Sequence, residues 1–156
     1  MNNIFYYETI IGKIGIIENG FAITQMNFIE KMPKGTNINE TVLLKGANRQ
    51  LQEYFSGKRK VFDLPLAPSG TEFQQKVWHA LREIPYGKTN SYKDIAKNIG
   101  NIKAARAVGM ANNKNPILIF IPCHRVIGSN GKLVGYAGGL DVKEKLLNIE
   151  KENRNN

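Results

Sequence analysis

Cysteine and histidine are scarce in this chain. Its 156 residues include one cysteine and two histidines. One cysteine excludes an internal disulfide, and three such side chains are too few for the four ligands of a structural zinc site. We therefore expect no metal.

Long apolar segments are also missing. The longest uninterrupted apolar run, residues 117–121, has five residues, and the first eight residues lack the basic start and apolar stretch of a signal peptide. We expect no membrane span and no secretion, and hence a cytoplasmic globular protein.

Basic residues are abundant and unevenly distributed. The chain carries 22 Lys and Arg against 13 Asp and Glu, a net charge of +9. Residues 1–70 contain 8 Lys and Arg against 6 Asp and Glu, whereas residues 71–156 contain 14 against 7. A polyanionic partner is favoured, and it should bind mainly the C-terminal part.

Composition also indicates a domain boundary. The segment 64–70 contains two prolines and a glycine and has neither helical nor strand periodicity. We predict an N-terminal α/β domain over residues 1–66, a linker at 67–70, a second domain at 71–150, and a frayed tail at 151–156.

The N-terminal part shows an alternating, β-branched pattern. Residues 4–10, 14–18 and 21–29 are predicted strands of an antiparallel meander, with Asn19-Gly20 at a tight turn. Spacings of three and four then predict a helix over about 39–56 that ends before Gly57, followed by a short strand near 61–64.

The C-terminal part begins with helical signals. Thr71 to Gln74 forms a capping-box pattern, and apolar residues follow at helical spacing. A short helix from Ser91 to about Gly100 and another from residue 101 or 102 to about 111 make a helix-turn-helix candidate. His79 faces away from the apolar stripe and is given no role.

The third of these helices is thin. Between residues 104 and 111 most side chains are small, and Arg106 is the one long side chain among alanines. Close packing against a neighbour and an ordinary surface arginine explain this pattern. A slim helix that enters the narrow minor groove of DNA explains it as well.

The only thiol lies in a chemically suggestive setting. The run 117–121 reads as a buried strand leading into Pro122, and Cys123 is followed directly by His124. A lone cysteine is usually inert and buried, whereas a neighbouring base can activate it as a nucleophile. Side chains alternate on a strand, so contact between these two needs a turn or a water molecule.

Several motifs together resemble one known family. The chain contains Pro122-Cys-His-Arg-Val126, Asn115-Pro116, Ser91-Tyr92, Ala105-Arg-Ala-Val-Gly109 and Gly135-Tyr-Ala-Gly-Gly139. In order and spacing over about 71–150 they resemble the O6-alkylguanine-DNA alkyltransferases, whereas residues 1–65 are similar only in general organisation. The resemblance implies an α+β protein: an N-terminal antiparallel sheet with a helix, of ribonuclease H-like fold, and a C-terminal helix-turn-helix or winged-helix-like domain.

The resemblance implies repair of O6-alkylguanine, with O4-alkylthymine a further substrate left open, in double-stranded DNA. One irreversible alkyl transfer to Cys123 would occur per molecule, without a cofactor. It makes His124 the group that takes the thiol proton through a water, Glu150 the partner of the other imidazole nitrogen, and Tyr92 the donor to the departing guanine.

The same resemblance assigns DNA contacts. Arg106 would fill the space left by a base rotated out of the duplex, with Ala105 and Tyr92 also at the DNA. Asn115 would fix the turn before the cysteine. The base pocket would be formed by Val126, Tyr136, Ala137 and Gly138, and the protein is expected to be monomeric. Some relatives have serine where Ala137 stands, so a hydroxyl contact to O6 would be missing here.

Two other function classes remain open from the sequence. One is a DNA-binding module without chemistry, against which the presence of Cys123 argues. The other is a hydrolytic or peroxidatic thiol site built from Cys123, His124 and Glu150.

Overall fold

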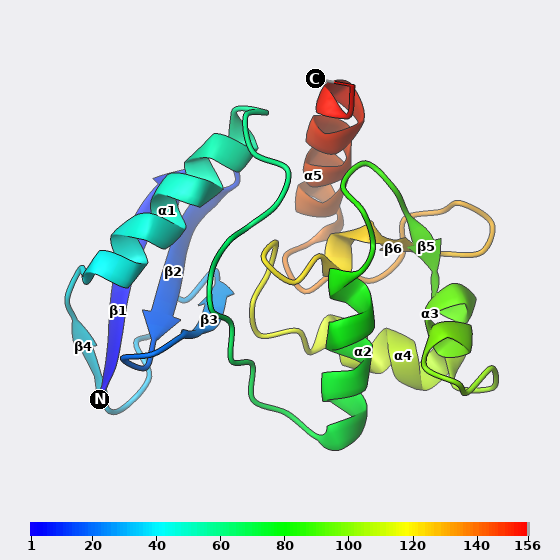
Figure 1. The fold of residues 1–156 in the computed structure, drawn as a ribbon, viewed down its shortest axis with the longest axis horizontal. Coiled ribbons are helices and arrows are strands. Elements are labelled where there is room, and N and C mark those ends of the chain that lie inside the picture. The colour runs from blue at the N-terminus through cyan, green and yellow to red at the C-terminus, as the bar shows by residue number, and fades with distance from the viewer. Residues whose placement is uncertain (156) are drawn as a thin grey trace. The chain divides into compact units, whose positions relative to one another are not determined.

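The computed structural model describes residues 1–155, and the chain divides into two compact units, Met1–Ser69 and the part from Gly70 onward. The first unit contains strands β1 (Asn2–Thr9), β2 (Gly12–Glu18), β3 (Ile23–Asn27) and β4 (Thr36–Ile38) and helix α1 (Val42–Phe55). Figure 1 shows α1 lying across the sheet.

The sheet has the strand order β3-β2-β1-β4. The predicted meander is confirmed for β1 to β3, which pair antiparallel. Asn19 and Gly20 form the predicted turn: the Asn19 side chain accepts from the N–H groups of Phe21 and Ala22, and Gly20 has a φ of 95°. Strand β4, parallel to β1, was not predicted, because its pairing is non-local and leaves no local turn signal.

The predicted strand at 61–64 is wrong. Both backbone groups of Asp63 bond to the buried Gln50 side chain of α1, whose amide donates at 3.0 Å and accepts at 2.9 Å. Pairing with the sheet is limited to one bridge between Ile23 and Leu66, and the prolines at 65 and 68 cannot donate to a ladder.

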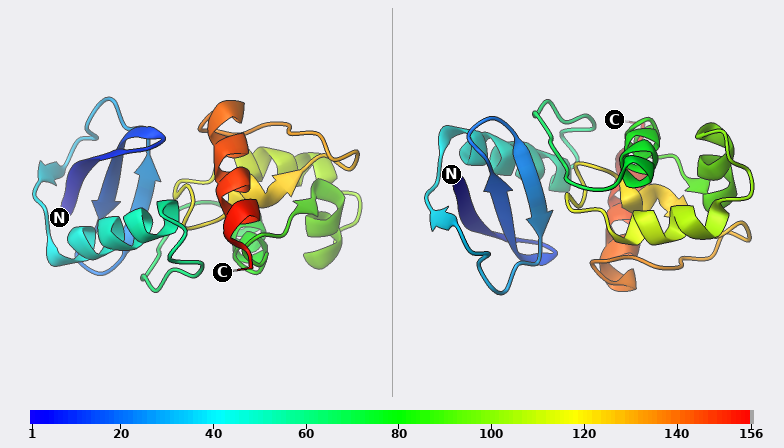
Figure 2. Two further views of the ribbon diagram at one scale, coloured as in Figure 1. Left: turned by 90° about the horizontal axis from the view of Figure 1, so that it is seen from above. Right: turned by 90° about the horizontal axis from the view of Figure 1, so that it is seen from below.

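The second unit contains α2 (Glu72–Arg82), β5 (Asn90–Ser91), α3 (Tyr92–Asn98), α4 (Ala105–Asn113), a 3-10 turn η1 (Cys123–Arg125), β6 (Val126–Ile127) and α5 (Leu140–Asn153). Thr71 and Ser91 cap α2 and α3 with complete capping boxes, as predicted for Thr71. Figure 2 shows these helices around the short β5-β6 pair.

Two boundaries differ from prediction. Helix α4 begins at Ala105 rather than at 101 or 102, since residues 101–104 form a turn closed by a hydrogen bond from the Ala104 N–H to the Asn101 carbonyl. Helix α5 continues through Asn153, so the expectation of fraying from Lys151 is wrong for residues 151–153. The last residue of that predicted tail, 156, lies outside the described residues.

The core of the second unit holds the helices together. Trp78 of α2 is buried, and its indole N–H donates to the carbonyl of Ala111 in α4 at 2.9 Å. Val108 of α4 and Ile95 of α3 are fully buried beside it in the contact between these helices. Burial of such side chains contributes about 2 kcal/mol each and fixes α3 and α4 as a pair.

None of the helices within residues 1–155 has the length and apolar character that crossing a bilayer requires.

Candidate active site

Cys123 lies on a tight turn and not at the end of a strand. Residues 117–121 fold back on themselves, with the Ile121 N–H donating to the Ile117 carbonyl at 3.1 Å. Ile119 has a φ of 70°, which a β-branched residue rarely adopts and which a strand does not contain. The predicted buried strand is therefore wrong, although the residues are buried as expected.

The side chain of Asn115 holds this turn. Its amide donates to the Ile121 carbonyl at 2.8 Å and its oxygen accepts from the Ile117 N–H at 3.0 Å. Asn112 of α4 adds a bond to the Cys123 carbonyl at 3.3 Å. Asn115, predicted to fix the turn, thus contacts both of its arms. Asn112, which no sequence pattern indicated, contacts the backbone of Cys123.

Three charged or ionisable side chains meet beneath the turn. The Nε2 of His124 lies 2.6 Å from Oε2 of Glu150. Arg125 forms a bidentate pair with the same carboxylate, donating from Nε at 2.8 Å and from Nη2 at 3.1 Å. All three side chains are buried. Helix α5 supplies Glu150, so only the tertiary fold brings the three together.

The Glu150 carboxylate has a further donor. The N–H of Gly87 donates to its Oε1 at 3.1 Å. The same carboxylate therefore fixes His124, Arg125 and the loop that follows α2. Arg125 donates in addition to the Ile84 carbonyl at 2.7 Å.

The electrostatics of this cluster favour a neutral imidazole. Burial alone would raise the pKa of Glu150, but hydrogen bonds and charge from His124 and Arg125 outweigh it and lower that pKa to about 2. Burial lowers the pKa of His124, against the effect of Glu150 and together with the positive charges of Arg125 and Lys143. At neutral pH, Glu150 is a carboxylate and His124 is able to accept a proton.

The thiol itself is held in its protonated form. Burial raises the pKa of Cys123 to about 11, against hydrogen bonding by Asn115 and the charge of Lys143. Four pKa units correspond to about 5 kcal/mol for forming the thiolate at pH 7. A nucleophilic role therefore requires that the proton be removed by a base during the reaction.

Tyr92 lies at the N-terminus of α3, beside α4. Gly109 of α4 lies next to the Tyr92 ring: a Cβ at this position would stand 3.7 Å from it, an ordinary van der Waals contact. The Tyr92 hydroxyl donates to the Val134 carbonyl at 2.9 Å. It is thus bonded to the loop that precedes the predicted base pocket.

Two of the three residues predicted to contact DNA, Ala105 and Arg106, lie at the start of α4, and the third, Tyr92, lies on α3. Arg106 is exposed, and Ala105 is half-buried at the first turn of the helix. In the predicted base pocket Val126 and Tyr136 are buried, Ala137 is exposed and Gly138 is half-buried. The Tyr136 hydroxyl is buried with no hydrogen-bond partner among the described residues, and burial raises its pKa.

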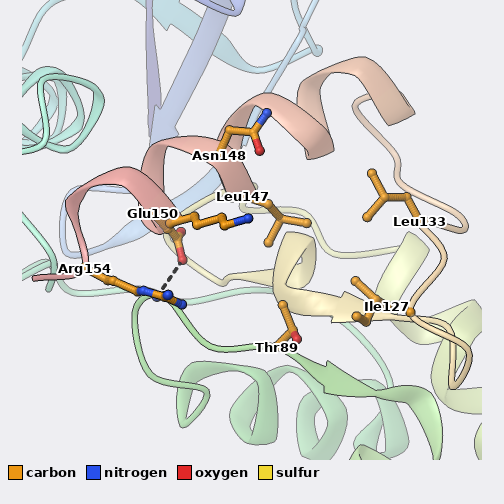
Figure 3. Close-up of a pocket in the computed structure, with 10 residues that line it drawn as sticks. Thr89, Ile127, Leu133, Leu147, Asn148, Glu150 and Arg154 are labelled. Atoms are coloured by element: carbon orange, nitrogen blue, oxygen red, sulfur yellow. Dashed lines mark hydrogen bonds between the residues drawn. The ribbon is translucent and has the colours of Figure 1, made fainter.

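A pocket of about 300 Å³ has Glu150 in its wall. It is lined by Thr89, Ile127, Leu133, Leu147, Asn148, Glu150 and Arg154, all labelled in Figure 3, with Gly87, Gly131 and Lys151. The lining does not include Cys123 or the predicted base-pocket residues. Within residues 1–155 no three His, Cys, Asp or Glu side chains come together in a way suited to a metal ion.

Two buried cations were missed as parts of the site. No role was predicted for Arg125 beyond its place in the cysteine motif, and Lys143 was not predicted to take part in the site. Arg125 stands in the cysteine motif and had a local signal. For Lys143, which lies on α5, no local sequence signal indicated burial or a part in the site.

Comparison with known proteins covers both units. Residues 72–152 match "6-O-methylguanine DNA methyltransferase, DNA binding domain", and residues 5–68 match the "ribonuclease-like domain" of the same family. The predicted fold class, with a ribonuclease-like sheet domain and a helical DNA-binding domain, is confirmed.

Curated relatives and solved structures agree. The chain is 54% identical over 149 residues to a methylated-DNA–protein-cysteine methyltransferase of Methanosarcina acetivorans, covering 92% of this chain and 95% of the relative. Identity is 48% to the constitutive enzyme of Bacillus subtilis, covering 97% and 96%. The crystal structure of Mycobacterium tuberculosis OGT in complex with DNA is similar with a TM-score of 0.91 and 43% identity, covering 97% and 94%. Because both of its units match the two domain models, the chain belongs to the 6-O-methylguanine DNA methyltransferase family.

Proposed function

We propose that this chain repairs O6-alkylguanine in double-stranded DNA by moving the alkyl group to Cys123, once per molecule, from a base rotated out of the duplex. Family membership makes the chain a DNA-repair methyltransferase whose acceptor is a cysteine, and Cys123 is the only cysteine. The observation that carries the proposal is the setting of this thiol, next to an imidazole held by a buried carboxylate.

The chemistry follows from that setting. The sulfur of Cys123 forms a bond to the alkyl carbon while the bond from that carbon to O6 breaks, and the thiol proton passes to Nδ1 of His124 through a water. Glu150 sets the imidazole tautomer by accepting from Nε2 and stabilises the imidazolium that forms. The imidazolium finally gives this proton to the departing guanine, whose O6 becomes a carbonyl.

The step is irreversible because a thioether has no good leaving group at neutral pH. Nothing in the reaction regenerates the thiol, so each chain reacts once. Tyr92 assists by turning its hydroxyl from the Val134 carbonyl to the departing guanine, where negative charge develops.

DNA recognition is assigned to α4. The alanines and Gly109 keep the helix narrow enough for the minor groove, and the exposed Arg106 occupies the space of the rotated nucleotide. Asn115 positions the acceptor turn, and Val126, Tyr136, Ala137 and Gly138 line the base pocket. Most contacts go to phosphates, so binding should be independent of sequence and weaken with salt.

The place of action follows from the substrate and the thiol. Its substrate is DNA, and a single acceptor thiol has to stay reduced, which a reducing cytoplasm ensures. We assign the protein to the cytoplasm, acting as a monomer.

Intact-mass spectrometry tests the proposal. After incubation with duplex DNA containing O6-methylguanine, the parent chain should gain the mass of one methyl group and no more, and Cys123→Ala should gain none while still binding DNA. Continued loss of methyl from DNA at an unchanged protein mass would indicate a hydrolase. An unchanged protein with unchanged DNA would indicate a binding module.

A further inference from the structure

Lys143 of α5 is a lysine without exposed surface and without a carboxylate in ion-pair distance among the described residues. Its ammonium donates to three backbone carbonyls: Val126 at 2.6 Å, Val134 at 2.9 Å and Gly135 at 3.2 Å. An ammonium has three N–H groups, and all three are used. A lysine so placed has no hydrogen left to give to a ligand.

The three carbonyls belong to two different segments of the proposed site. Val126 follows directly on the turn η1 that holds Cys123, whereas Val134 and Gly135 directly precede the pocket residues Tyr136 to Gly138. The segments are otherwise linked by a long loop. Lys143 thus joins the acceptor turn to the loop that would hold the base.

The Val134 carbonyl has a second donor, the Tyr92 hydroxyl at 2.9 Å. If Tyr92 turns toward the base, this carbonyl keeps only its bond to Lys143. The loop then stays in place while the tyrosine moves.

We propose that Lys143 is a positioning residue for alkyl transfer, which fixes the base-pocket loop relative to Cys123 and retains the Val134 carbonyl when Tyr92 turns to the guanine. The inference rests on the proposed function. Its positive charge also opposes the rise in the pKa of the Cys123 thiol that burial causes.

The test uses the stoichiometric reaction to separate geometry from folding. Lys143→Met removes the ammonium and keeps an unbranched chain, and Lys145→Met, on the exposed side of the same helix, is the matched control. Single-turnover methylation by O6-methylguanine duplex gives an amplitude, which reports the folded fraction, and a rate constant at saturating DNA, which reports the site.

We expect the rate constant of Lys143→Met to fall at least tenfold per reactive molecule, with the affinity for unmodified duplex unchanged and Lys145→Met reacting like the parent. A loss of amplitude with an unchanged rate constant would show a purely structural lysine and overturn the inference. A parent chain that accepts no methyl group would instead refute the proposed function.

A second measurement does not depend on the lysine variant folding. In ¹⁵N-labelled Cys123→Ala, the Nζ signal of Lys143 should be protected from exchange and should shift with O6-methylguanine duplex but not with unmodified duplex. An identical signal with both duplexes would contradict the coupling between Lys143, Val134 and Tyr92.

Discussion

The two units use their buried polar side chains differently. Of the buried polar residues among those described, Glu18, Thr36 and Gln50 lie in the first unit and Asn112, Asn115, His124, Arg125, Lys143 and Glu150 in the second. In the first unit each of them serves a different part of the backbone: Glu18 accepts from the Gly20 N–H at 2.8 Å, whereas Gln50 bonds the backbone of Asp63. In the second unit they surround one short segment, the turn that holds Cys123.

This difference shows where polar burial serves chemistry. A buried polar group costs free energy unless it is satisfied, and the second unit meets this cost with a network in which carboxylate, guanidinium and imidazole bond one another. The imidazole of His124, next to Cys123 in the chain, is held in a fixed orientation by this network. The first unit has no comparable convergence.

The largest effect is expected for Glu150→Gln. The amide cannot balance Arg125, which leaves a buried cation and destabilises the fold by about 3–5 kcal/mol, and it no longer fixes the His124 tautomer. Methyl transfer should slow at least about a hundredfold, as for loss of a general base. Quenched single-turnover reactions measure the rate of methyl transfer, and urea unfolding measures the stability.

Glu144→Gln, exposed on the same helix, is the control. The double variant Arg125→Met/Glu150→Gln removes both charges and should recover stability but not rate. If Glu150→Gln transferred methyl groups at the parent rate, the Glu150 carboxylate would have no part in the reaction.

A smaller effect, limited to one substrate, is expected for Arg106→Ala. Transfer from duplex DNA should fall about tenfold, since unstacking a base costs a few kcal/mol and the arginine offsets part of it. Transfer from the free alkylated base should not change. Rates on both substrates, with Arg82→Ala as an exposed control on α2, provide the comparison, and equal losses on the two would count against the assigned role.

Acid should weaken the second unit in a defined range. The folded pKa of Glu150 is about 2, below its ordinary 4.5, so its contribution is complete above pH 4.5 and is lost as pH falls toward 2. The pKa of His124 is also lowered, so the unfolded imidazole binds protons first below about 6.5 and the loss begins there.

The Glu150 shift by itself predicts that the free energy of unfolding decreases by about 3 kcal/mol between pH 6 and pH 2, and the His124 shift adds to this decrease. Urea titration at each pH measures it. Glu150→Gln should show a shallower decrease. A parent curve that is flat over this range would mean that the carboxylate is not paired in solution.

The smallest effect belongs to the first unit. Gln50→Ala removes both bonds to the Asp63 backbone and should cost about 1–3 kcal/mol of stability while leaving the rate of methyl transfer by folded molecules unchanged. Gln52→Ala, exposed on the same helix, should change neither. A slower methyl transfer by folded Gln50→Ala would contradict the conclusion that the buried polar residues of the first unit serve stability alone.

Local signals were sufficient for part of the fold and part of the site. The capping box at Thr71, the Asn19-Gly20 turn and the alternating strands each involve residues within a few positions of one another, so their physics is contained in the sequence pattern. The motif around Cys123 identified the acceptor for the same reason, through resemblance to the family.

Other features depended on distant residues. Strand β4 pairs with β1, more than thirty positions away in the chain. The backbone of Asp63 forms hydrogen bonds with the Gln50 side chain and not with a strand of the sheet. Apolar composition at 117–121 indicated burial but could not reveal that Ile119 turns the chain back.

By itself the sequence determined the two-part organisation, the basic second half and the single thiol beside an imidazole, because composition and short-range patterns encode them. Only the tertiary structure decided that Glu150 bonds both His124 and Arg125 and that Lys143 joins the turn to the pocket loop. The pairing of buried charges depends on which segments the fold brings within hydrogen-bond distance, and no local pattern specifies that.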